Sequence, residues 1–177
     1  MGTARGVDLT PPCIRPADPR DFPAVLAIYN HYIVHSHVTF DVRPFDSSER
    51  EVWFAQFAGT GRSRLFVADD APGLAGYACS TPFRPKPAYG TSVETTVYVH
   101  PECTGRGIGR LLYEPLLQAL GTEDVHRAYA VIVLPNPASI RLHVELGFRL
   151  AATLREVGRK FGKYWDVSWY ERSFPRA

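Results

Sequence analysis

Charge of one sign and long apolar runs are both scarce in this chain, and their scarcity excludes two kinds of partner. The 177 residues carry a formal net charge of only +2, and no lysine or arginine run exceeds a pair, which argues against nucleic acid. No apolar run approaches the length that spans a membrane, and the polar segment 1–12 lacks the apolar centre of a secretion signal. We expect neither a nucleic-acid nor a membrane partner.

Cysteine is also scarce. The three cysteines, Cys13, Cys79 and Cys103, are an odd number without the spacing of a metal site. They are typical of free thiols in a reducing compartment, because a disulfide framework would need paired cysteines. The sequence therefore predicts a cytoplasmic protein without a bound metal.

The composition that is present is that of one ordinary globular domain. Apolar residues make up 45% of the chain and charged residues 21%, and the length suits a single sizeable core. There is no repeat, low-complexity segment or linker. We expect a flexible lead-in over residues 1–12 and a single domain over residues 13–177.

Apolar periodicity predicts an alternation of strands and helices. Strands are expected at residues 13–16, 64–68, 74–81, 91–100 and 127–134, with two more around 158–162; helices are expected from 19, after the Asp18 cap, to about 35, from 46–48 to before 59–61, at 106–120 and at 137–146. The second helix has two candidate capping boxes, Ser48 with Glu51 and Asp46 with Glu49. Pro115 predicts a bend or an early end in the third helix. The order β-α-α-β-β-β-α-β-α-β-β indicates an α/β sheet with helices on both faces.

The clearest strand leads into a run of glycines. Along residues 91–100, Val93, Thr95, Val97 and Val99 alternate with Glu94, Thr96 and Tyr98, so the two sets lie on opposite faces. Next come Gly105, Gly107 and Gly109 and then an apolar-periodic helix. Bare N–H groups at a positive helix end suit phosphate or pyrophosphate, although such a run alone is equally well a plain turn. Arg110 and Leu111 stand where a phosphate-binding loop needs Lys and Ser or Thr, and the late position excludes a dinucleotide fingerprint.

Two side chains near these glycines are candidates for proton transfer, and each also has a plainer interpretation. Glu94 is either a solvent-facing carboxylate or a general base that deprotonates an ammonium group. His143, which lies seven residues after Asn136, is either a packed helical residue or a proton carrier.

A proline-stiffened loop precedes the Glu94 strand and carries Arg84, Lys86 and Tyr89. These residues form either a solvated loop or a site for a carboxylate or phosphinate on a substrate. The aromatic residues from Phe161 to Tyr170 suit core and edge strand, and exposed rings there would suit a dimer interface.

At this point the motifs resemble a known family. The turn at residues 105–109 is similar to the acyl-CoA pyrophosphate loop of the GCN5-related N-acetyltransferase (GNAT) superfamily. Five stretches in the right order resemble its phosphinothricin acetyltransferase branch, and together they span about residues 13–174: residues 29–33, 93–99, 134–139, 141–148 and 160–166.

The resemblance implies a fold and a reaction. The fold is the GNAT-type acyl-CoA N-acyltransferase fold, with a mixed central sheet of about six to seven strands. The reaction transfers acetyl from acetyl-CoA, as cosubstrate, to the α-amine of a small amino-acid-like substrate such as phosphinothricin, methionine sulfoximine or methionine sulfone. It also implies a homodimer with the C-terminal strands near the interface. Two alternatives are a protein or peptide N-acetyltransferase and a non-catalytic acyl-CoA-binding module.

The resemblance also implies residue roles. Glu94 is the general base, and His143 protonates the leaving thiolate or shares the base role, in a position where many relatives carry tyrosine. Those implied for acetyl-CoA are Val97, Tyr98 and Val99 by strand-like pairing, Gly105, Arg106, Gly107, Ile108, Gly109 and Arg110 as the pyrophosphate cradle, and Asn136 and Ser139. Those implied for the amino-acid substrate are Arg84, Lys86, Tyr89, Thr96 and Tyr98. The chain departs from the branch at Thr104, where Gln or Arg is usual, and at Gly90, where a larger residue is common.

Overall fold

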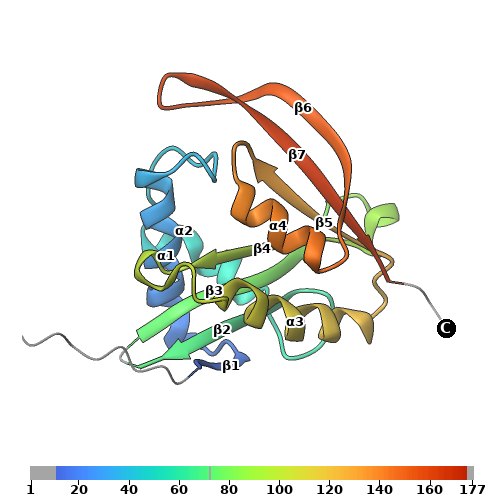
Figure 1. The fold of residues 1–177 in the computed structure, drawn as a ribbon. Coiled ribbons are helices and arrows are strands. Elements are labelled where there is room, and N and C mark those ends of the chain that lie inside the picture. The colour runs from blue at the N-terminus through green and yellow to red at the C-terminus, as the bar shows by residue number, and fades with distance from the viewer. Residues whose placement is uncertain (1–10, 72, 175–177) are drawn as a thin grey trace, which may run out of the picture.

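The computed structural model describes residues 11–71 and 73–174 and centres on one seven-stranded sheet (Figure 1). Its strand order is β1-β2-β3-β4-β5-β7-β6, and all neighbours are antiparallel except the parallel pair β4 and β5. The mixed sheet is therefore confirmed. Most of the expected lead-in, residues 1–10, lies outside the described residues, and residues 11–12 have no regular structure.

The elements follow the predicted order. The strands are β1 Cys13–Pro16, β2 Arg64–Asp70, β3 Gly73–Pro82, β4 Ser92–Val99, β5 Arg127–Val133, β6 Arg149–Lys160 and β7 Lys163–Ser173. The helices are α1 Phe22–His35, α2 Ser47–Ala55, α3 Ile108–Gly121 and α4 Pro137–Glu145, with short 3-10 turns at Pro19–Asp21, Pro87–Tyr89 and Pro101–Cys103. In Figure 1 the β6–β7 hairpin extends beyond the rest of the sheet.

Local capping fixes where α2 begins. The Asp46 carboxylate accepts a hydrogen bond from the Glu49 N–H at 2.9 Å, and the Glu49 carboxylate accepts one from the Asp46 N–H at 3.0 Å. Of the two candidate capping boxes, Asp46 with Glu49 is the one that forms.

The two faces of the sheet carry separate apolar clusters, as the predicted helices on both faces require. On one face α3 and the residues around α4 pack on the sheet, and Val93 of β4 belongs to this cluster. On the other face α1 covers β2 and β3, and Tyr98 of β4 packs there together with residues of α2. The alternation predicted along β4 is confirmed, because Val93 and Tyr98 lie on opposite faces.

Helix α3 runs through Pro115 to Gly121, so of the predicted bend or early end the early end does not occur. Leu112, Leu116 and Leu120 are fully buried against the sheet on either side of the proline. Burying each leucine contributes about 1.5–3 kcal/mol, while an internal proline costs about 3 kcal/mol. Tertiary packing therefore offsets the lost hydrogen bond and the helix continues.

Strands β4 and β5 separate in the middle of the sheet. Their parallel pairing covers only residues 92–94 of β4 and 127–129 of β5. Beyond Glu94, the edge of β4 that faces β5 has no strand partner within the described residues. The sheet therefore opens at the C-terminal half of β4, just before the glycine turn.

Candidate active site

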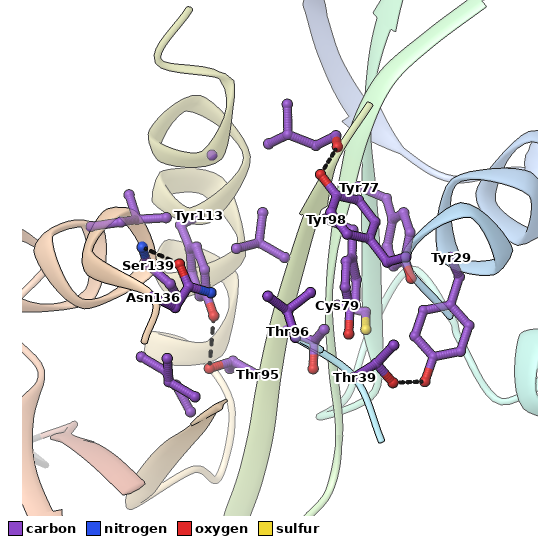
Figure 2. Close-up of a pocket in the computed structure, with 18 of the residues that line it drawn as sticks. Tyr29, Thr39, Tyr77, Cys79, Thr95, Thr96, Tyr98, Tyr113, Asn136 and Ser139 are labelled. Carbon is purple, nitrogen blue, oxygen red and sulfur yellow. Dashed lines mark hydrogen bonds between the residues drawn. The ribbon is translucent and has the colours of Figure 1, made fainter. Parts of the chain in front are cut away.

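A cavity of about 860 Å³ surrounds the open half of β4. Figure 2 shows its two sides: Tyr113, Asn136 and Ser139 lie on one side of β4, and Tyr29 and Cys79 lie on the other. The structure brings most of the predicted site residues together as its lining: Glu94, Thr96, Val97, Tyr98, Val99, Gly105, Gly107, Ile108, Gly109, Arg110, Asn136, Ser139 and His143.

The glycine turn presents backbone N–H groups to the cavity. Gly105 and Gly107 both have a φ of 77°, a left-handed conformation that glycine adopts without strain. The Arg110 N–H is the first to donate into the helix, to the Gly107 carbonyl at 3.0 Å, so the preceding N–H groups stay available. A Cβ at Gly109 would lie 3.0 Å from the Leu142 side chain, so this position is closely packed as well. These features fit a phosphate-bearing group at the positive end of α3.

Two side chains of this turn are engaged elsewhere. The Arg106 guanidinium donates to the Asp70 carboxylate at 2.8 Å, and Arg106 does not line the cavity. The Thr104 hydroxyl donates to the Pro101 carbonyl at 3.1 Å, which gives this departure from the family pattern a local structural role. Among the predicted cradle residues, Arg106 is thus the one that does not line the cavity. Arg110 lines it, with its guanidinium paired to Glu114 at 2.8 Å and Glu145 at 3.5 Å.

Two further contacts fix the end of β4 and the start of α4 in the cavity wall. The Tyr32 hydroxyl donates to the Val99 carbonyl at 2.6 Å and ties the end of β4 to α1. The Asn136 side chain caps α4 by accepting from the Ser139 N–H at 3.1 Å. Sequence reasoning gave Tyr32 no role, although it lies within the motif at residues 29–33.

His143 is buried, with 3% of its surface exposed, and both ring nitrogens have partners. Its Nδ1 lies 2.7 Å from the Ser139 carbonyl and donates to it, so Nε2 accepts from the Tyr113 hydroxyl at 2.8 Å. Burial lowers the pKa of His143, and the hydrogen bond to Ser139 opposes this shift. The imidazole is therefore neutral near pH 7.

Tyr113 links His143 to β4, and sequence reasoning missed it. Its hydroxyl also lies 3.3 Å from the Thr95 hydroxyl (Figure 2). The Thr95 hydroxyl in turn donates to the Tyr129 carbonyl at 3.2 Å. Tyr113 is fully buried and lines the cavity. The available signal was a tyrosine in the apolar stripe of α3, since a buried phenol hydroxyl usually finds a polar partner.

Glu94 faces the cavity from the middle of β4 with its side chain 33% exposed. Desolvation raises the pKa of Glu94, and the nearby charge of Arg84 opposes the rise. The Arg84 Nη1 lies 3.9 Å from the Glu94 Oε2. A half-buried carboxylate with a raised pKa is a stronger base than an exposed one.

The three residues of the loop after β3 that were predicted to bind substrate lie beside the main cavity and not in its lining. The Arg84 guanidinium lies over the rings of Phe83 and Trp169, 4.4 and 5.2 Å from their centroids, and beside Glu94. Arg84, Lys86 and Tyr89 are all exposed, and none of them lines the main cavity.

Tyr89, Gly90 and Arg84 border a separate cleft of about 400 Å³. A Cβ at Gly90 would lie 3.0 Å from the Pro87 carbonyl oxygen. Close packing against the 3-10 turn therefore accounts for the glycine at this departure from the branch.

On the far side of β4, residues that the sequence did not indicate complete the wall. The Tyr29 hydroxyl lies 2.9 Å from the Thr39 hydroxyl and also donates to Asp41. Desolvation, aided by Asp41, raises the pKa of Tyr29 to about 12. Arg50 and Trp53 of α2 line the same wall.

Other sequence predictions can be placed on the described residues. Cys13, Cys79 and Cys103 are all free thiols, as their number and spacing indicated. Residues 11–71 and 73–174 contain no group of three or more His, Cys, Asp or Glu side chains that could hold a metal ion. None of the helices in this part of the chain has both the length and the apolarity to cross a membrane.

Comparison with known proteins agrees with this geometry. The family model described as an acetyltransferase (GNAT) domain matches residues 14–169. The chain is 55% identical over 161 residues to phosphinothricin N-acetyltransferase of Streptomyces coelicolor, covering 90% of this chain and 94% of the relative. It is 34% identical over 158 residues to an L-methionine sulfoximine/L-methionine sulfone acetyltransferase of Pseudomonas aeruginosa, covering 89% and 92%.

Solved structures agree as well. The yncA structure from Salmonella typhimurium, which contains its cofactor acetyl-CoA, superposes with a TM-score of 0.88 at 32% identity, covering 95% of this chain and 96% of that one. A phosphinothricin acetyltransferase from Sinorhizobium meliloti, in complex with acetyl-CoA, gives 0.87 at 30% identity, covering 93% and 89%. The chain therefore belongs to the GNAT family of acetyltransferases.

Proposed function

We propose that this N-acetyltransferase moves an acetyl group from acetyl-CoA to the α-amine of a small amino-acid-like substrate, of the phosphinothricin, methionine sulfoximine or methionine sulfone type. The observation that carries the proposal is the position of Glu94. Its carboxylate lines the same cavity as the glycine turn, at the point where β4 and β5 separate. The named activities of the relatives support the same substrate class.

The donor side of the cavity holds acetyl-CoA. The N–H groups of Gly107, Ile108 and Gly109 bind the pyrophosphate, while the open edge of β4 pairs with the pantetheine arm. Asn136 and Ser139 hold the acetyl end. Acetyl-CoA supplies an acetyl group activated as a thioester, and backbone N–H groups of β4 near Val99 polarise its carbonyl.

Glu94 removes a proton from the substrate ammonium, directly or through one water molecule. An amine is mostly protonated near pH 7 and cannot attack until it loses that proton. The desolvation that raises the pKa of Glu94 supports this role, because it strengthens the carboxylate as a base. Arg84 holds the α-carboxylate of the same substrate, a role that its distance of 3.9 Å from Glu94 supports. Thr96 and Tyr98 form the wall, and Lys86 and Tyr89 lie at the rim.

His143 takes part in proton transfer through Tyr113. It protonates the departing thiolate or shares the base role with Glu94. The neutral ring and the acceptor state of Nε2 favour the shared base role, because a neutral imidazole that already donates from Nδ1 has no second proton to give.

The protein acts as a homodimer in the cytoplasm. Exposed apolar side chains of the β6–β7 hairpin support the dimer: Leu150, Leu154, Val157, Phe161 and Tyr164. Exposed large apolar side chains concentrated on one hairpin suit an interaction surface. Free thiols support a reducing compartment. Sedimentation velocity of the wild type and of Phe161→Glu tests the dimer; a wild-type monomer at micromolar concentration would contradict it.

The experiment that tests the proposed function is CoA release from acetyl-CoA across a panel of amines. The panel includes phosphinothricin, methionine sulfoximine, methionine sulfone, ordinary amino acids and short peptides. Turnover with free amino acids but not with peptides is expected. Turnover with peptides alone would show a peptide N-acetyltransferase, and acetyl-CoA binding without CoA release for any amine would show a binding module.

A further inference from the structure

Arg50 of α2 has an unusual environment for a cation inside a cavity wall. Only 19% of its side-chain surface is exposed, and its guanidinium carbon lies 4.9, 4.3 and 5.1 Å from the ring centroids of Tyr29, Phe45 and Trp53. The rings hold the guanidinium by cation–π contacts and restrict its orientation.

The hydrogen-bonding capacity of Arg50 is largely unused. Its one ionic partner within the described residues is Asp41, with Nη2 3.5 Å from Oδ2, and that carboxylate already accepts from the Tyr29 hydroxyl. No residue in the described part of the chain forms a hydrogen bond with the Arg50 guanidinium, which carries five N–H donors. Since Arg50 lines the main cavity, these donors are available to a bound molecule.

Arg50 and Glu94 face the same region of the cavity from different elements. The charges of Arg50 and Glu94 both act on the thiol of Cys79, which lies on β3. Desolvation raises the pKa of Cys79 to about 12; Glu94 adds to the rise and Arg50 opposes it. Figure 2 shows Cys79 on the same side of β4 as Tyr29, whose ring Arg50 contacts.

The two arginines near this region suit different parts of one amino acid. An α-carboxylate is separated from the α-amine by a single carbon, so its cation must lie beside the general base, as Arg84 does at 3.9 Å from Glu94. Arg50 forms no ion pair with Glu94 and belongs to the aromatic wall of α1 and α2. Its place on a different wall of the same cavity suits a group at the end of the substrate side chain.

We infer that Arg50 forms a side-chain subsite that binds a distal tetrahedral oxygen group, such as a phosphinate, sulfone or sulfoximine, on the amino-acid substrate. This inference rests on the proposed function. The planar guanidinium offers two parallel N–H donors to two oxygens of one group, and the surrounding rings accept the aliphatic stem. The subsite distinguishes oxidised side chains from their apolar parents.

L-Methionine and L-methionine sulfone are the matched substrates for the test, because they differ only in two oxygens on sulfur. In the wild type, kcat/KM is expected to be higher for the sulfone. Arg50→Met is expected to lower kcat/KM for the sulfone about 10- to 100-fold, the range for loss of a charge-assisted hydrogen bond, and to change that for methionine less than about threefold. Arg50→Lys, which keeps the charge without the planar donors, is expected to give an intermediate loss.

Two controls separate binding from folding. Arg43→Met removes an exposed arginine that pairs with Glu49 at the same end of α2. It should change kcat/KM for neither substrate. Acetyl-CoA affinity and the melting temperature, measured for every variant, report the donor site and the fold. Calorimetric titration of methionine sulfone into protein saturated with CoA gives the same comparison without turnover.

The outcomes are distinct. If Arg50→Met lowers kcat/KM and binding affinity for the sulfone but not for methionine, the subsite is supported. Equal losses for both substrates, or no loss for either, overturn it while leaving the proposed acetyl transfer intact. A wild type that acetylates no free amino acid refutes the proposed function and the subsite with it.

Discussion

The buried hydrogen bond between Tyr113 and His143 gives a prediction whose size follows from the structure. Tyr113→Phe removes one hydroxyl and leaves the ring in place. The Nε2 of His143 then loses its donor in a site where His143 is 3% exposed and Tyr113 fully buried. An orphaned buried acceptor costs about 1–3 kcal/mol. Thr95 loses its contact with the Tyr113 hydroxyl at 3.3 Å but keeps its bond to the Tyr129 carbonyl, so the orphaned acceptor is on His143.

Urea denaturation measures this loss in the free energy of unfolding, and a thermal scan measures it as a fall in Tm. For a chain of this length, a loss of about 2 kcal/mol corresponds to a fall in Tm of roughly 4–8 °C. Tyr89→Phe is the matched control, because its side chain is exposed and lies outside the proposed dimer surface, so its change should stay within about 0.5 kcal/mol. A loss below about 0.5 kcal/mol in Tyr113→Phe would refute the hydrogen bond, and with it the link from His143 to β4.

Three further predictions concern Glu94, Gly105 and Leu116. Because burial raises the pKa of Glu94 in the folded protein, its ionised form destabilises the fold; stability is complete below the ordinary value of 4.5 and falls as pH rises through the raised pKa. Glu94→Gln should therefore have a higher Tm than the wild type at pH 8 and an equal one near pH 4; a lower Tm at pH 8 would contradict the burial. Gly105→Ala places a side chain at a φ of 77°, so it should lower the free energy of unfolding by about 1–2 kcal/mol, measured by denaturation. It should also lower the affinity for acetyl-CoA, measured by calorimetry; unchanged values of both would argue against the turn geometry. Leu116→Ala should cost about 2–5 kcal/mol by urea denaturation, because Leu116 is fully buried beside Pro115; a shorter helix with little lost stability would show that packing does not sustain α3.

The sequence allowed the fold and the donor side of the site to be predicted because their determinants are local. The alternation along β4, the glycines after it and the cap at Asp46 all act over a few residues. Pro115 shows the limit of such reasoning, because the burial of leucines on a distant sheet offset its local cost.

The rest of the site depends on contacts between segments far apart in the chain, which periodicity does not encode. Arg50 meets Tyr29 through the packing of α2 on α1, and Arg106 turns away to Asp70, 36 residues earlier. Tyr113 gains its role from His143, 30 residues later. In each case the residue type was visible in the sequence, but its partner was not.

The central claim is that Glu94 deprotonates an amine bound beside acetyl-CoA. The most direct measurement compares wild type, Glu94→Gln and the exposed control Glu51→Gln at saturating amine near pH 7, with acetyl-CoA affinity measured on the same samples. Glu94→Gln is predicted to lower kcat by at least about 100-fold, the usual minimum for a lost general base, with acetyl-CoA affinity unchanged and Glu51→Gln fully active. Full turnover in Glu94→Gln would contradict the account.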